Sequence, residues 1–168
     1  MRRLGLILLV IACVLIQVSL LPALRPFGVV PNVLLGLVAL VGLEDTASLA
    51  LVVAVASGIT LDVASGTPFG MWTVVLVLAA LVTGLIHRAG LELAGGLVAG
   101  SIVIVGTIIM NVGTLLSVAP VVSHWPVGRL LGQVGLQLVL NLLLVWALKP
   151  LVKWVGPGAG AEFGRVGG

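Results

Sequence analysis

Charged side chains are scarce in this sequence, and their scarcity narrows the classes of protein that it can encode. Asp, Glu, Lys and Arg make up only 8% of the 168 residues, whereas 61% are hydrophobic. The mean hydropathy is +1.37. Soluble domains carry about 25% charged residues, so this chain lacks the polar surface that a water-soluble exterior requires. The sequence therefore predicts an integral membrane protein, and its length suits one domain.

Side chains that usually carry catalysis or bind metals are also few. Cys13 is the single cysteine, which excludes a disulfide or a CxxC pair within the chain. His87 and His124 are isolated, with no second acid nearby, so we expect no metal site and no cofactor. The chain has no P-loop and no HExxH motif. Its eight Lys and Arg residues are too few to indicate a nucleic-acid partner.

Six apolar runs follow one another along the chain and predict a bundle of six membrane segments. They cover residues 4–24, 27–43, 47–61, 69–86, 97–118 and 129–148. The first run is a retained span rather than a signal peptide, and Pro22, Arg25 and Pro26 are expected to end it. Lys149-Pro150 and Lys153 are expected to close the last run. The second and third runs are shorter than the roughly 20 residues of a normal span. They are either two short spans or a hairpin that does not cross fully. We expect one transmembrane domain over 1–155 and a flexible Gly-rich tail over 156–168.

Basic residues gather on one side of these segments. If both termini are cytoplasmic, six basic residues lie inside and two lie outside, which satisfies the positive-inside rule. The inside group is Arg2, Arg3, Arg88, Lys149, Lys153 and Arg165, and the outside group is Arg25 and Arg129. The four tryptophans fall where an aromatic belt belongs. Trp72 and Trp125 lie at outer ends, and Trp146 and Trp154 at the inner end of the last segment.

The third run carries a strip of small residues that leads to an acid. Ala50, Ala54 and Gly58 precede Asp62 in steps of four. Residues four apart stack on one helix face. In lipid, small residues let a neighbouring backbone approach closely. Ala50, Ala54 and Gly58 are therefore expected to form a helix-packing face.

A sharp turn is predicted directly after this face. Ser65-Gly66 and Pro68 with Gly70 are turn residues, and a new helix is expected to begin at Phe69. Asp62 stands at the start of the turn, and an ionisable group at membrane depth is a functional candidate. We favour a simpler interpretation, in which its carboxylate accepts hydrogen bonds from N–H groups around Ser65-Gly66.

Gln133, Gln137 and Asn141 form a polar stripe along the last run, because they also step by four. Amides in lipid need partners, so this stripe is expected to face other helices or a cavity. Hydrogen bonding between helices is the favoured interpretation, and a substrate pathway is the alternative. Asn111 and Gln17 are single polar residues of the same kind.

The central stretch resembles the rod shape-determining protein MreD family. The resemblance is carried by Gly58-x-x-x-Asp62-x-x-Ser65-Gly66-x-x-x-Gly70, preceded by Pro31-Asn32 before a leucine-rich run. It extends along the chain in length, basic N-terminus and number of apolar runs. Glu44-Asp45 departs from the pattern, since the family commonly has a basic turn there.

The resemblance implies a non-enzymatic scaffold of the bacterial elongation machinery, in the inner membrane. Such a protein binds the single-span protein MreC and helps to connect MreB filaments with cell-wall synthases. The signature positions Gly58, Asp62, Ser65, Gly66 and Gly70 are expected to be architectural. The family is also similar in fold to the substrate-binding subunits of energy-coupling-factor transporters.

Two other functions compete with the scaffold. A vitamin-binding subunit of an energy-coupling-factor transporter would fit the polar stripe and the similar fold. Such subunits carry an Ala-x-x-x-Ala docking pattern on the first span, where Ala12 here stands alone. An intramembrane hydrolase would use Ser65 as its nucleophile, but such a serine needs a base and an oxyanion site.

Overall fold

The structure is a computed structural model that describes residues 2–24, 28–44, 47–66, 68–90, 95–118 and 127–155. Within these residues all regular secondary structure is helical, and there are no strands. The elements are α1 (Arg2–Leu15), η1 (Ile16–Leu20), α2 (Leu21–Leu24), α3 (Val33–Glu44), α4 (Ala47–Ser65), α5 (Met71–Arg88), α6 (Gly95–Val118) and α7 (Val127–Val155). In the described part, five helical stretches are long and apolar enough to cross a membrane. The prediction of an all-helical, multi-pass membrane protein is confirmed; the similarity to transporter subunits stays a prediction.

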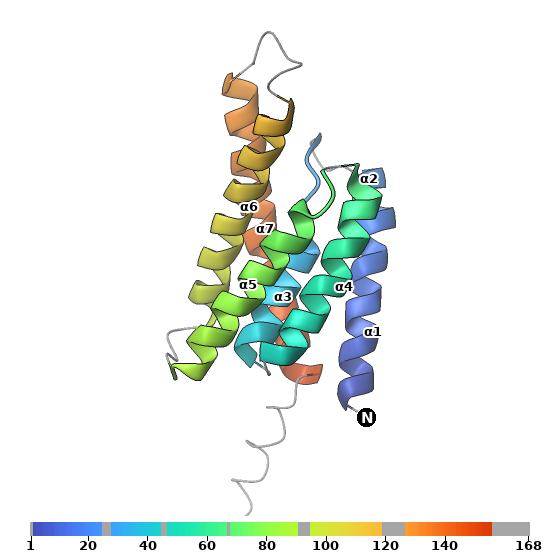
Figure 1. Ribbon diagram of the computed structural model, residues 1–168, viewed down its shortest axis with the longest axis vertical. Helices are drawn as coiled ribbons and strands as arrows, with labels where there is room; N and C mark the ends of the chain where they lie inside the picture. The colour runs from blue at the N-terminus through green and yellow to red at the C-terminus, as the bar shows by residue number, and fades with distance from the viewer. Residues whose placement is uncertain are drawn as a thin grey trace, which may run out of the picture.

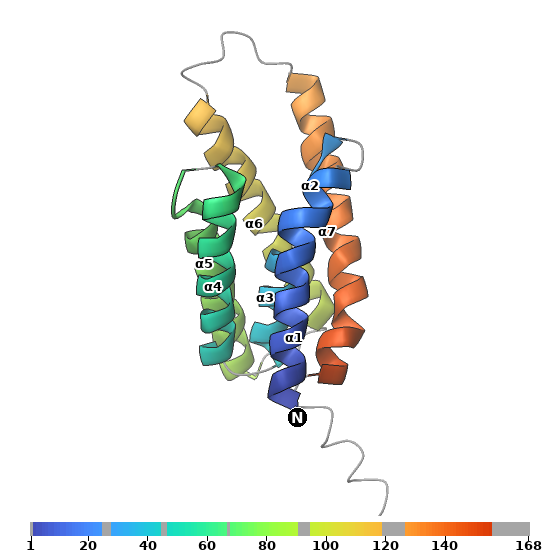
Figure 2. The same ribbon diagram turned by 90° about the vertical axis from the view of Figure 1, so that its right-hand side faces the viewer.

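The helices form one elongated bundle, and successive helices run in opposite directions (Figures 1 and 2). The start of α1 and the end of α7 lie at the same end of this bundle. The turn between α4 and α5 lies at the other end, as does α2. We call these the terminal end and the turn end of the bundle. The tail, residues 156–168, lies outside the described residues, as do Arg25, Asp45 and His124.

The short helix α3 is the centre of the bundle. It has 12 residues and is apolar on every side, and Val33 to Gly42 are all buried. It contacts α1, α4, α5, α6 and α7. A helix that is apolar all round is expected to be buried, but about 18 Å of helix cannot cross a hydrocarbon core of about 30 Å. The non-helical residues 29–32 precede it on the side of the turn end.

The first span continues through Pro22 and reaches Leu24, the predicted end of its apolar run. The five residues of η1 form a π-helical turn just before this proline, and the Leu21 N–H bonds to the Ile16 carbonyl. In a regular helix, proline lacks a donor and clashes with the carbonyl four residues earlier. A wider turn changes that geometry, so the helical path reaches Leu24.

Two helices run longer than predicted. The third segment ends at Ser65 and has 19 residues, so it is long enough to span and Asp62 lies within its last turns. The last helix continues through Pro150 to Val155, since proline is tolerated in membrane helices where neighbouring groups satisfy the freed backbone. The fourth segment begins at Met71 rather than Phe69.

Candidate functional site

The small-residue face of α4 packs against its neighbours. Ala50 and Ala54 are fully buried, and Gly58 is buried as well. A Cβ atom on Gly58 would clash with the Cα of Thr73 on α5, so only glycine allows this approach. Accordingly, α4 makes its most extensive contact with α5.

Asp62 is buried at 4% exposure, and its carboxylate caps the start of α5. Oδ1 accepts from the Trp72 N–H at 2.8 Å, and Oδ2 accepts from the Thr73 N–H at 3.1 Å and the Thr73 hydroxyl at 2.6 Å. The predicted partners, N–H groups around Ser65-Gly66, were therefore wrong. The first N–H groups of a helix have no partner within the helix, and its dipole favours an anion there. Gly70, at the N-cap position, has no side chain for this role.

The turn between α4 and α5 uses the predicted glycines. Gly66 and Gly70 have φ angles of +65° and +96°, which side-chain-bearing residues rarely adopt. Ser65 is the last residue of α4 and is exposed. It lies at the turn end, whereas His87 lies at the terminal end of α5. The structure thus separates Ser65 from that histidine, whose Nδ1 is 2.7 Å from the Leu43 carbonyl oxygen.

The unwound residues 29–32 are held by amide side chains. Gln17, in the π-helical turn, donates to the Pro31 carbonyl at 3.1 Å and accepts from the Val33 N–H at 2.7 Å. Gln137 donates to the Val30 carbonyl at 3.1 Å. Backbone that is not helical can exist at membrane depth only where protein groups satisfy it. These amides therefore permit α3 to begin part-way down the bundle.

The polar stripe of α7 serves the same segment. Asn141 is 1% exposed, accepts from the Asn32 N–H at 2.6 Å and donates to the Thr107 hydroxyl at 2.8 Å. Gln137 also accepts from Asn111 at 2.9 Å, which ties α7 to α6. Gln133, one turn further toward the turn end, is half-buried. Asn141 and Gln137 thus bond across elements, and Gln137 and Gln133 both line a pocket.

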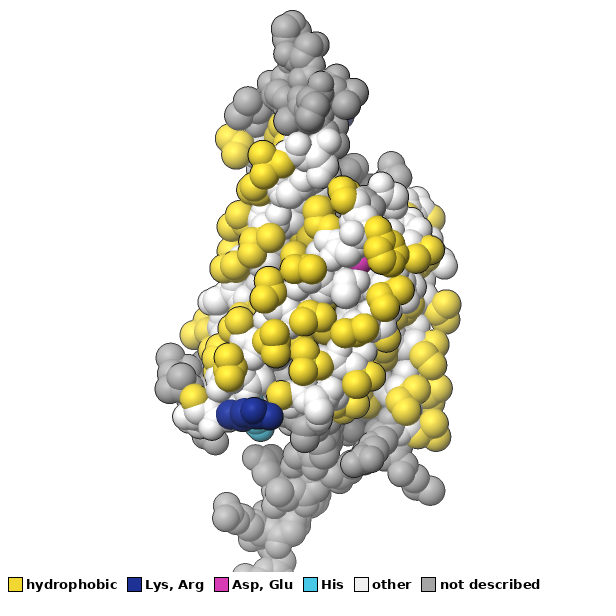
Figure 3. Space-filling model, in the orientation of Figure 1, with side chains coloured by type: hydrophobic (Ala, Val, Ile, Leu, Met, Phe, Trp, Pro, Cys, Tyr) yellow, Lys and Arg dark blue, Asp and Glu magenta, His cyan; other side chains and the backbone are white. Residues whose placement is uncertain are grey.

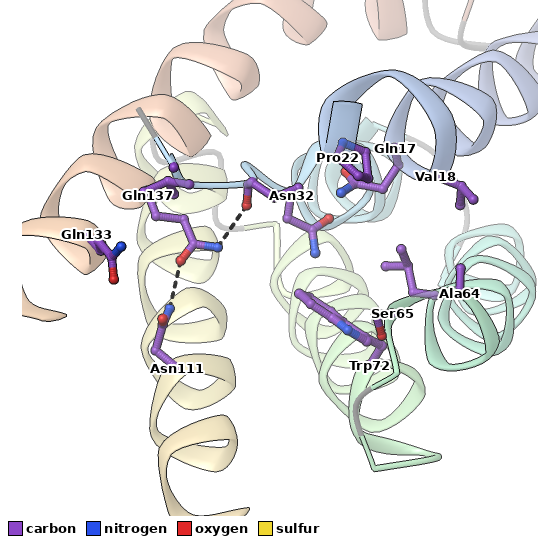
Figure 4. Close-up of a pocket in the computed structure, with 14 residues that line it drawn as sticks. Gln17, Val18, Pro22, Asn32, Ala64, Ser65, Trp72, Asn111, Gln133 and Gln137 are labelled. Carbon is purple, nitrogen blue, oxygen red and sulfur yellow. Dashed lines mark hydrogen bonds between the residues drawn. The ribbon is translucent and has the colours of Figure 1, made fainter. Parts of the chain in front are cut away.

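That pocket opens at the turn end and has a volume of about 410 Å³. Figure 4 shows its labelled side chains arranged around one space, with contributions from several helices. Five amide side chains line it: Gln17, Asn32, Asn111, Gln133 and Gln137. The apolar part of its lining includes Val18, Pro22, Val29, Leu61 and Ala64. The pocket is thus polar on one part of its wall and apolar on another.

Two donors in this pocket have no hydrogen-bond partner among the residues that the structure describes. Asn32 is 2% exposed, and its Oδ1 caps α3 by accepting from the Leu35 N–H at 2.9 Å. This bond fixes the other end of the amide as the NH2 group, and Nδ2 is unpaired. The indole Nε1 of Trp72 is likewise buried and unpaired. Trp72 lines the pocket from the start of α5, and the aromatic belt stays a prediction.

Sequence reasoning missed most of this pocket. Gln17 had been noted only as a single polar residue, and Asn32 only within the family resemblance. A polar residue directly before an apolar run is a helix-capping signal, and it could have pointed to Asn32. Trp72 gave no such signal, because a tryptophan at a helix end fits a membrane interface equally well.

A separate apolar groove of about 350 Å³ runs between α5 and α6. Figure 3 shows this face of the molecule, which is covered largely by hydrophobic side chains. The walls of the groove are Val75, Leu78 and Val82 on α5 and Ile102, Val105 and Ile109 on α6. Ala79, Ser101 and Gly106 add small residues to its lining.

The described residues contain no group of three or more His, Cys, Asp or Glu that could hold a metal ion. No family model matches the chain, and neither a curated protein nor a solved structure matches it. The membership of the MreD family therefore stays a prediction from the residues quoted above.

Proposed function

We propose that this chain is a non-catalytic scaffold of the bacterial rod complex, an MreD-type subunit of the inner membrane with both termini in the cytoplasm. Its partner is a single-span protein of the MreC kind, through which it is connected to MreB filaments and cell-wall synthases. The proposal rests chiefly on the groove between α5 and α6.

The groove has the chemistry of a site for a transmembrane helix. Its lining is almost wholly apolar and it lies between two helices long enough to span. Lipid tails are as apolar as a leucine side chain, so helices associate in membranes by close packing, which small residues permit. Ser101 and Ala79 leave room there for the side chains of a partner helix.

The signature stretch supports a structural role. Gly58 admits the backbone of α5, and Asp62 accepts three hydrogen bonds at the start of that helix. Gly66 and Gly70 supply the left-handed turn conformations. Each of these four residues therefore has a packing or capping role in joining α4 to α5. A catalytic role is not needed to explain their presence.

A matched pair of substitutions in α6 tests the groove. Ser101 and Ser117 are both exposed, and each hydroxyl donates to the carbonyl four residues earlier. Only Ser101 lines the groove. We expect Ser101→Phe to reduce co-purification of the single-span partner from bacterial membranes at least severalfold, and Ser117→Phe to leave it unchanged. Equal recovery with both variants would contradict docking in the groove.

Crosslinking and cell shape complete the test. A photo-crosslinking residue at Val105, in the groove, should capture the single-span partner, whereas one at Leu143 on α7 should not.

Depletion of the protein should turn rod-shaped cells round, and normal cell width after depletion would exclude the scaffold function. The transporter alternative predicts a different partner, an ATP-hydrolysing coupling module, so the same purification separates the two functions.

A further inference from the structure

We propose that the pocket at the turn end binds a small, uncharged molecule that has at least two hydrogen-bond acceptors on an apolar skeleton. The pocket shares no lining residue with the groove between α5 and α6. Its occupant is therefore independent of the scaffold partner.

The unpaired donors define the polar part of this ligand. Asn32 Nδ2 and Trp72 Nε1 are both buried, both unpaired and both on side chains that line the pocket. In Figure 4 the Asn32 amide and the Trp72 ring extend into the same space from two different helix starts. A buried donor without a partner costs about 1–3 kcal/mol. Acceptors such as carbonyl oxygens would satisfy both groups.

The size and walls of the pocket favour an organic molecule over water. Its volume of about 410 Å³ lies within the range of about 300–1,000 Å³ that is usual for small-molecule sites. Water alone would require on the order of ten molecules there, each needing two to four polar partners. Val18, Leu61 and Ala64 provide none with their side chains, so water beside them would lose hydrogen bonds.

The charges around the pocket favour an uncharged ligand. No Asp, Glu, Lys or Arg is among the described residues that line it. The nearby acid, Asp62, is engaged by three donors of α5. An ion in such a site would lack a counter-charge, and burying an unpaired ion is strongly unfavourable.

The amide framework keeps the site open before a ligand arrives. Gln17 and Gln137 hold the backbone of the unwound segment, and the cap on α3 fixes the orientation of Asn32. In membrane proteins, unwound backbone is found where it is buried in protein or lines a cavity. A site whose donors are fixed in advance loses less entropy on binding.

Small molecules released from the purified protein provide the test. The full chain is purified from native membranes in mild detergent, denatured, and the released compounds are identified by mass spectrometry. The variants are Trp72→Phe, which removes only the indole donor, and Asn32→Ser, which keeps an acceptor to cap α3 but removes Nδ2. Trp154→Phe is the matched control, because Trp154 is 80% exposed on α7 and far from the lining set.

A second pair distinguishes loss of the ligand from loss of the fold. Ala64→Leu places an apolar side chain into the pocket, and Ala56→Leu makes the same change at an exposed position of α4 that does not line it. Both proteins should elute as monodisperse species in gel filtration. Only Ala64→Leu should lose the bound compound.

The expected result is one uncharged, acceptor-bearing compound that is released from the wild type, Trp154→Phe and Ala56→Leu. Its amount should fall by up to about tenfold in Trp72→Phe and Asn32→Ser, the effect of one lost hydrogen bond. The proposal is overturned if the wild type releases no compound beyond those that Ala64→Leu releases. The pocket would then hold only water. It is also overturned if the compound is charged, or if Trp72→Phe retains the wild-type amount.

Discussion

At the scale of single residues, the structure explains why an acid stands in an apolar helix. A carboxylate in lipid is costly unless donors surround it. Asp62 meets this condition because the start of α5 presents three donors to it. The turn glycines let the chain reverse so that the start of α5 lies within hydrogen-bonding distance of Asp62. The buried acid therefore depends on the turn for its donors, and the start of α5 depends on the acid for its cap.

Substitutions of Asp62 should separate the hydrogen bonds from the charge. Asp62→Asn keeps one acceptor oxygen and should lower the free energy of unfolding by about 1 kcal/mol. Asp62→Leu leaves the donors of Trp72 and Thr73 without an acceptor and should cost about 2–4 kcal/mol. Thermal unfolding in detergent measures both. Equal effects of the two substitutions would show that these hydrogen bonds do not contribute to stability.

Gly58 offers a sharper steric test. Gly58→Ala would bring a methyl group against the backbone of Thr73, which cannot move aside as a side chain can. We expect a loss of about 1–3 kcal/mol, as for overpacked cores. Gly135→Ala is the control, since nothing lies within 4 Å of a Cβ there, and it should be neutral or gain up to about 1 kcal/mol. A destabilising Gly135→Ala together with a silent Gly58→Ala would refute the close approach of α4 and α5.

At the scale of elements, the last helix and the unwound segment before α3 form one unit. The sequence identifies the polar stripe of α7, because a spacing of four places its amides on one face. It does not reveal that two partners of that stripe are backbone groups, the Asn32 N–H and the Val30 carbonyl. Neither the π-helical turn at Gln17 nor the late start of α3 at Val33 leaves a distinct pattern in an apolar run. The all-helical fold could thus be predicted, whereas the unwound segment and most of the pocket could not.

The three residues of the stripe should therefore contribute unequally to stability. Asn141→Leu should cost about 1–3 kcal/mol, because it removes the acceptor for the Asn32 N–H and a buried bond to Thr107. Gln137→Leu should cost about 1 kcal/mol, since its bonds are only part-buried. Gln133→Leu should change stability by less than about 0.5 kcal/mol. Unfolding of the three variants in the same detergent checks this order. Equal costs along the stripe would disprove the role assigned to Asn141.

At the scale of the whole molecule, the alternating helix directions determine which loops share a side of the membrane. The turn between α4 and α5 and the end of α5 are expected on opposite sides, because α5 has 18 residues and is apolar enough to cross a membrane. The positive-inside rule predicts that the end of α5, with Arg88, lies in the cytoplasm. In this proposed orientation the pocket faces the outside of the cell, and both termini face the cytoplasm.

Cysteine labelling in intact cells tests this arrangement. Cys13 is the single cysteine and is buried. Its replacement in Cys13→Ala removes any background labelling. In that chain, Phe69→Cys, at a position 74% exposed in the turn, should react with a membrane-impermeant maleimide from outside. Ala89→Cys, also exposed, should react only after the cells are permeabilised. Labelling of Ala89→Cys before permeabilisation would reverse the orientation. It would place the pocket in the cytoplasm, where its ligand would have to be a cytoplasmic compound.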